Sequence, residues 1–142
     1  MKKPTFKESI SKAGKMLWNV FPLILGTILL VSLMVTLIPK SFYLFIFQGN
    51  NIIDPIIGGL IGSISVGNPM ISYIIGGELL NQGISLIAVT AFIVAWVTVG
   101  VIQLPAESMI LGKKFALIRN LISFVFSIIV AIVTIAILGV VS

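Results

Sequence analysis

The chain alternates long apolar stretches with short polar ones, at lengths that suit a lipid bilayer. Three stretches are poor in charge and long enough to be membrane spans: residues 17–38, 84–112 and 115–141. Twenty-two residues of helix extend about 33 Å, and the hydrocarbon core of a bilayer measures roughly 30 Å. The pattern therefore predicts three full transmembrane helices, the second of them kinked at Pro105.

A fourth apolar stretch, residues 55–80, is interrupted at its centre by Gly67-Asn68-Pro69. Proline removes a backbone donor and ends the helix before it, while Asp54-Pro55 suits an N-cap followed by the first residue of a helix. The arms 55–66 and 69–80 each extend only about 18 Å as helix, too short to cross alone. Two interpretations stay open: a re-entrant hairpin, or one kinked helix that crosses.

Composition fits an integral membrane protein. The 142 residues are 58% hydrophobic and 9% charged, with a mean hydropathy of +1.23, whereas soluble domains carry roughly 25% charged residues. We expect one all-α polytopic domain with no separate soluble part. The chain has no cysteine and no histidine, which excludes disulfides and the usual zinc ligands. It also lacks the common catalytic and nucleotide-binding motifs, so we expect neither an enzyme nor a metal or cofactor site.

The basic residues predict the orientation, because lysine and arginine beside membrane spans favour the cytoplasmic side. Five lysines precede the first span, and residues 1–16 are expected to form an interfacial helix capped by Thr5 and Glu8, or a frayed basic tail. The second basic cluster consists of Lys113, Lys114 and Arg119. A re-entrant hairpin places both clusters in the cytoplasm, so it is the preferred interpretation. The expected location is the inner membrane of a prokaryotic cell, with the N-terminus cytoplasmic and no nucleic-acid partner.

Polar side chains gather around the break in the fourth stretch, where unwound carbonyl and amide groups also become available. In transporters such breaks mark the substrate site, and a helix N-terminus favours anionic groups. The predicted substrate-binding residues are Ser63, Ser65, Gly67, Asn68, Pro69, Ser72 and Tyr73. The alternative is that the hydroxyls only satisfy the broken backbone.

Two carboxylates near the spans, Glu78 and Glu107, are candidates for carrying a coupling proton, because ionisable groups at membrane depth are often functional. The alternative for Glu107 is a structural pair with Lys113 or Lys114. Small residues at helical spacing predict close helix contacts, either within the monomer or between copies. They are Gly58 and Gly62, then Ala88, Ala91, Ala95 and Thr98, then Asn120, Ser123, Ser127, Ala131 and Thr134.

The run GGLIGSISVGNPMISYIIGGELLNQGISLIAVTAFIVAWVTVG, followed by LGKKFALIRN, resembles one repeat of the permease family that includes the organoarsenical efflux permease. The matching positions are Gly62, Gly67, Pro69, Gly83, Ala91, Phe92, Gly112 and Arg119. Because the family usually fuses two repeats, the resemblance implies a half-transporter, which acts as at least a dimer or with a paired second-half chain. The cysteine that arsenical permeases carry near the break is absent.

The sequence thus predicts an oligomeric permease subunit that moves a small polar or anionic solute or a metalloid compound and touches membrane lipid. The alternatives are a non-transporting scaffold or assembly subunit, and a passive channel. The transport interpretation requires that Asn68-Pro69 be unwound within the bilayer and shielded by protein.

Overall fold

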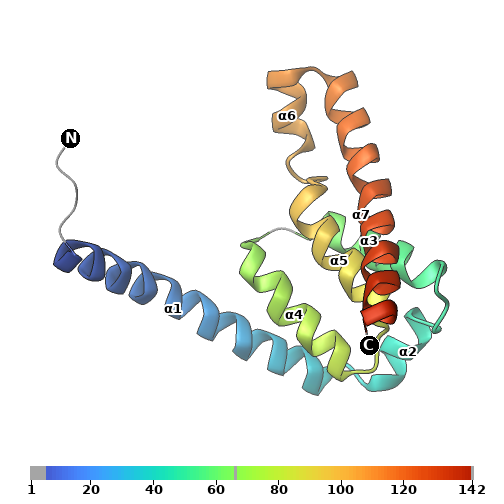
Figure 1. Ribbon diagram of the computed structural model, residues 1–142, viewed down its shortest axis with the longest axis horizontal. Helices are drawn as coiled ribbons and strands as arrows, with labels where there is room; N and C mark the ends of the chain where they lie inside the picture. Colours follow the sequence, from blue (N-terminus) through green and yellow to red (C-terminus); the bar gives the residue numbers. More distant parts are fainter. Residues whose placement is uncertain (1–5, 66, 142) are drawn as a thin grey trace. The chain divides into compact units, whose positions relative to one another are not determined.

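The computed structural model describes residues 6–65 and 67–141, and every regular element among them is a helix (Figure 1). The chain divides into two units, Met1–Leu37 and Ile38–Ser142. The first contains helix α1, and the second contains helices α2 to α7. The expected all-α class is confirmed.

Helix α1, Phe6–Leu37, runs without interruption through the boundary expected near residue 16. A separate interfacial helix is therefore not observed. From Phe6 onward the described residues of that segment belong to the same helix as the stretch 17–37, which was expected to be the first span. Pro22 lies in the interior of α1 rather than in its first turns. Thr5, the expected capping residue, lies outside the described residues. Only α1 and the region Lys113–Val140 of α7 are long and apolar enough to cross a membrane as single described helices, judged by length and composition.

The break in the interrupted stretch is confirmed. Helix α3, Ile53–Ile64, follows the short helix α2, Lys40–Ile46, and helix α4, Pro69–Asn81, begins at the proline. Asn68 is the N-cap of α4, and its side-chain oxygen accepts a hydrogen bond from the Met70 N–H at 3.0 Å. The expected capping role of Asp54 is wrong. Asp54 lies inside the first turn of α3, and the Asn50 side chain accepts from the N–H groups at the start of that helix.

The predicted kinked helix over 84–112 is two helices. Helix α5, Leu86–Thr98, ends before Gly100, and helix α6, Leu104–Leu111, begins with Pro105 in its first turn. Proline is tolerated at the start of a helix, whereas in the interior it removes a hydrogen bond. Gly112 then turns the chain at φ +88° into helix α7, Lys113–Val141.

Helix α5 lies at the centre of the second unit and packs against α3, α7 and α4. A Cβ at Gly58 would lie 2.2 Å from the Ala88 carbonyl oxygen, and one at Gly62 would lie 2.3 Å from that of Phe92. Because both pairs advance together along the chain, α3 and α5 run parallel. Gly76 approaches Val89 and Gly67 approaches Trp96, so α4 runs in the opposite direction (Figure 1).

Most residues of the small-residue stripes are buried within the chain, on the faces where these helices meet, whereas Thr98 is exposed. Ala88, Ala91 and Ala95 of α5 are buried, as are Asn120, Ser127 and Ala131 of α7. Ile87, Ala91 and Ala131 form one apolar cluster between α5 and α7. Without bulky side chains the helices can approach closely, which increases dispersion contact. The monomer-folding interpretation of these stripes is therefore the one the structure supports.

Candidate functional site

Two helix breaks lie side by side in the second unit. The first separates α3 from α4, and the second separates α5 from α6. The Val101 N–H approaches the Ser63 carbonyl oxygen at 3.4 Å, and the Trp96 indole nitrogen approaches the Gly67 carbonyl oxygen at 3.4 Å. Both of these long hydrogen bonds therefore run from donors on the α5–α6 side to carbonyl groups on the α3–α4 side. Unwound backbone needs such partners, since an unpaired buried polar group is costly.

A cavity of about 390 Å³ opens where the breaks meet. Its lining combines exposed backbone at both breaks with polar side chains: Ser65, Gly67, Pro69, Trp96, Val97, Thr98, Val99, Gly100, Gln103 and Arg119. The volume lies within the range of small-molecule sites. In this apolar chain, the cavity is a place where polar side chains and freed peptide groups converge.

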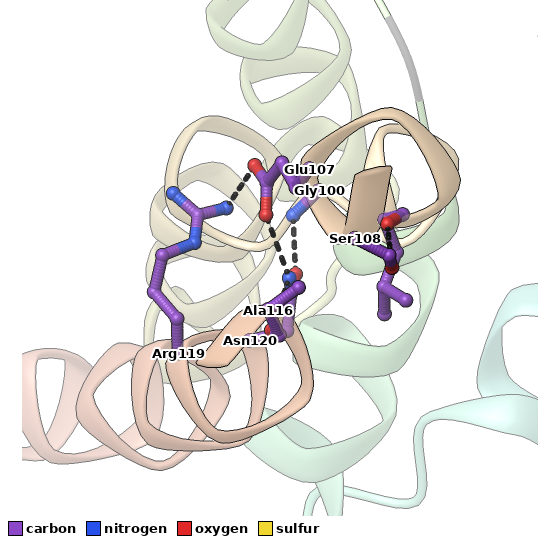
Figure 2. Close-up of polar contacts among 7 residues, drawn as sticks. Gly100, Glu107, Ser108, Ala116, Arg119 and Asn120 are labelled. Atoms are coloured by element: carbon purple, nitrogen blue, oxygen red, sulfur yellow. Dashed lines mark hydrogen bonds and ion pairs between the residues drawn. The ribbon is translucent and has the colours of Figure 1, made fainter. Parts of the chain in front are cut away.

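A polar network includes two residues of the cavity lining, Gly100 and Arg119, and Figure 2 shows its contacts. Arg119 of α7 forms an ion pair with Glu107 of α6, and the Asn120 amide donates to the other oxygen of Glu107 at 3.2 Å. Asn120 also donates to the Ala116 carbonyl at 3.0 Å and accepts from the Gly100 N–H at 2.9 Å. Every polar atom of the Asn120 side chain is thus engaged. The expected partners of Glu107 were Lys113 or Lys114; its partner in the structure is Arg119, one helical turn and more along α7.

Three of the seven predicted substrate-binding residues, Ser65, Gly67 and Pro69, line the cavity. The others do not. Ser63 and Ser72 are buried, and their hydroxyls donate to the carbonyls of Leu60 and Pro69 at 2.7 Å. The Ser65 hydroxyl likewise donates to Ile61 within its own helix.

Asn68 and Tyr73 also lie outside the cavity lining. Asn68 caps α4, and Tyr73 is 63% exposed. Bonding of a serine hydroxyl to its own helix backbone is common in membrane helices and satisfies the hydroxyl locally. The predicted residues therefore divide into those that line the cavity and those that complete the local structure of the hairpin.

Glu78, the other candidate for proton coupling, lies near the opposite end of α4 from the break. It accepts hydrogen bonds from the Gln82 amide at 2.7 Å and the Asn81 amide at 3.5 Å. Nine residues of helix separate it from Pro69, about 14 Å. Glu78 and the cavity are therefore separate features, whereas Glu107 is joined to the cavity through Arg119.

The sequence analysis did not assign the rest of the polar lining to the site: Trp96, Thr98, Gly100 and Gln103 on the α5–α6 side, and Arg119 of α7. The available signal was the pairing of Gly100 with Pro105, which together interrupt a helix. We interpreted Pro105 alone, as a kink, and a kink leaves much less backbone unwound than the break between Thr98 and Leu104.

A second buried polar feature lies where α2, α3 and α5 begin or end. The Asp54 carboxylate, 1% exposed, accepts from the N–H groups of Gln48 and Gly49 at 3.1 and 2.9 Å. These bonds hold the loop before α3, and the N-terminal position in α3 also favours negative charge. Among the described residues no group of three or more acidic residues, histidines or cysteines is close enough together to hold a metal ion.

Comparison with known proteins finds no match for this chain among family models, curated proteins or solved structures. The resemblance to a permease repeat therefore stays a prediction that depends on the quoted residues alone.

Proposed function

We propose that this protein is a membrane permease subunit, with its substrate site in the cavity between the two helix breaks. The observation that carries the proposal is the meeting of the breaks around polar lining groups in a chain that is otherwise apolar. Irregular backbone is tolerated at membrane depth only where protein buries it or a watery cavity receives it. The substrate class is a small polar or anionic solute or a metalloid compound.

The proposed membrane arrangement has three crossings and one re-entrant hairpin. α1 and α7 cross, and α5 with α6 makes the third crossing beside α7. The opposite directions of α3 and α4 along α5 support a hairpin that returns to its starting side. This arrangement keeps Lys113 and Lys114 on the same side as the N-terminal lysines, as the positive-inside rule requires. The N-terminus is then cytoplasmic, in the inner membrane.

Transport should depend on cavity residues that carry no structural hydrogen bond. Gln103 lines the cavity and its side chain is exposed, so Gln103→Ala leaves the fold intact. Asn51→Ala, in the exposed loop before α3, is the matched control. We expect proteoliposomes with the wild type to accumulate a solute from a panel of radiolabelled phosphate, arsenite and acetate, and the flux to saturate.

In the same assay, Gln103→Ala should lower flux at least about fivefold, the effect of losing one to two polar contacts in a site, while Asn51→Ala has no effect. If the wild type moves no solute of the panel, or if Gln103→Ala transports as well as the control, the cavity is not the substrate site. Flux that rises linearly with concentration would instead indicate a channel.

One observation favours the second candidate, a scaffold or assembly subunit. The hydroxyls of Ser63, Ser65 and Ser72 each donate to a nearby backbone carbonyl, so none of these three donors is left for a substrate. For a scaffold, Gln103→Ala and Pro69→Ala change assembly or have no effect, and neither changes a solute flux. Purification of a complex with a partner protein, together with the absence of any solute flux, would support the scaffold function over the permease function.

A further inference from the structure

We propose that the cavity selects a small oxyanion, which binds Arg119 in competition with the side chain of Glu107. This inference rests on the proposed function, because it names the substrate class of the same cavity. Among the described residues Arg119 is the one charged residue in the cavity lining, and the others are neutral. An anion entering the cavity therefore meets the guanidinium of Arg119, whose charge is shared with Glu107.

The guanidinium of Arg119 is only partly used by the protein. Its Nη2 pairs with Glu107, and its Nε is buried without a hydrogen-bond partner among the described residues. The other terminal nitrogen points away from Glu107 in Figure 2. Arginine offers five N–H donors in a planar fork that matches carboxylate and phosphate oxygens. The structure thus leaves donor capacity on the residue that faces the cavity.

The ion pair is built so that it can open without leaving a carboxylate unsupported. Glu107 retains the hydrogen bond from Asn120 at 3.2 Å, and Asn120 is itself held by Gly100 and Ala116. The side chains of Arg119 and Glu107 are 39% and 18% exposed, so the arginine is the more accessible partner. Half-exposed pairs contribute little free energy, which makes exchange of one oxyanion for another inexpensive.

A second donor is available beside Arg119. Gln103 lies in the same lining, and no hydrogen bond occupies its side-chain amide among the described residues. The Trp96 indole nitrogen, by contrast, already faces the Gly67 carbonyl. We expect an oxyanion in this cavity to accept one hydrogen bond from Arg119 and another from Gln103, because both side chains line it.

The test is binding of inorganic phosphate to the purified protein in detergent, measured by the shift of its unfolding temperature against sodium chloride at equal ionic strength. The wild type should be stabilised in a saturable manner. Arg119→Gln should weaken binding at least about tenfold, as loss of a charged hydrogen-bond donor does. Lys113→Gln removes the same charge from the same helix outside this cavity lining and should leave binding unchanged.

Glu107→Gln separates competition from a purely structural role. Removing the competing carboxylate should tighten phosphate binding about threefold, the value of a half-exposed pair. A structural role predicts lower stability with no tighter binding. Where Arg119→Gln does not fold, Gln103→Ala replaces it and should weaken binding. The proposal is overturned if phosphate stabilises no more than chloride, or if both Arg119→Gln and Gln103→Ala bind like the wild type.

Two further experiments are needed. One identifies the source of the oxyanion, and the other separates failure of the anion site from failure of the permease function. Mixed micelles of phosphatidylglycerol are compared with phosphatidylcholine. Stabilisation that depends on Arg119 and occurs only with phosphatidylglycerol assigns the oxyanion to a lipid headgroup. If phosphate binds but no flux occurs in proteoliposomes, the proposed anion site is supported and the proposed permease function is wrong. If Arg119→Gln does not change the flux and phosphate does not bind, the proposed anion site is wrong and the proposed permease function still stands.

Discussion

Gly58 and Gly62 show how single residues position the hairpin against α5. At each, a Cβ would lie within 2.3 Å of a backbone carbonyl oxygen, and backbone cannot move aside as a flexible side chain can. Glycine at these positions is therefore required by close approach. It places the end of α3 beside the unwound chain that follows α5, which forms one side of the cavity.

This reasoning predicts opposite effects at two glycines of the hairpin. Gly58→Ala should lower the free energy of unfolding by about 1–3 kcal/mol, because the methyl group overlaps the Ala88 carbonyl. Gly77→Ala, in α4, meets no atom within 4 Å and should raise stability by about 0.5–1 kcal/mol. Denaturant titration in detergent measures both, and equal effects at the two positions would refute the packing argument.

Asp54 is a second single residue that fixes the position of the hairpin. Its carboxylate is buried, and it is held by two backbone N–H groups rather than by a cation. A buried charge without bonds is expensive, and these bonds together with the start of α3 offset that cost. The residue therefore ties the loop after α2 to the hairpin.

At the scale of elements, the important finding is the direction of each helix along α5. α3 runs parallel to α5 and α4 antiparallel, so the chain reverses at Asn68-Pro69. The cap and the proline explain where α4 begins. The reversal itself follows from packing, since Gly76 faces Val89 while Gly67 faces Trp96.

Reversal predicts that both ends of the hairpin lie on one side of the membrane. The chain has no cysteine, so single-cysteine variants report cleanly. Asn51→Cys and Asn81→Cys, one at each end of the hairpin, should both react with an impermeant maleimide added to the outside of intact cells. Lys113→Cys, at the start of α7, should react only after the cells are opened.

The kinked crossing helix makes a different prediction for these variants. It places positions 51 and 81 on opposite sides of the membrane, so one of the two would resist labelling from outside. That result would also remove the re-entrant hairpin from the proposed topology.

At the scale of the whole molecule, the chain carries more broken backbone than one copy covers. Gly67 and Pro69 at the first break are exposed, as are residues 101–103 at the second. In hydrocarbon each unsatisfied peptide group costs several kcal/mol. Most of the small-residue faces cannot contact a second copy, because the chain's own helices already bury them. For the proposed membrane placement we expect this cover to come from a second copy or a paired chain, apart from the backbone that the watery cavity receives.

We therefore predict at least a dimer in the membrane. Native mass spectrometry from mild detergent, at several protein concentrations, should show a dimer or a larger assembly of the single chain, or a stable complex with a second chain. A monomer that still transports in proteoliposomes at less than one copy per vesicle would contradict this prediction.

The apolar periodicity by itself determined the all-helical class and the approximate extent of most helices, since these depend on neighbouring residues and on helix propensity. It also located the break at Asn68-Pro69, because capping and proline act within one turn. The sequence analysis missed that helix α1 continues from Phe6 through the boundary expected near residue 16. The helix can continue there because residues 6–16 contain no proline.

Only the tertiary structure decided which parts meet. The contact between Ser63 and Val101 joins residues 38 positions apart, and the ion pair between Glu107 and Arg119 joins residues 12 positions apart. No rule based on neighbouring residues predicts either pair. The cavity arises from two breaks brought together by the close contact of α3 with α5. Its lining therefore depends on helix direction and packing, which are properties of contacts distant in sequence.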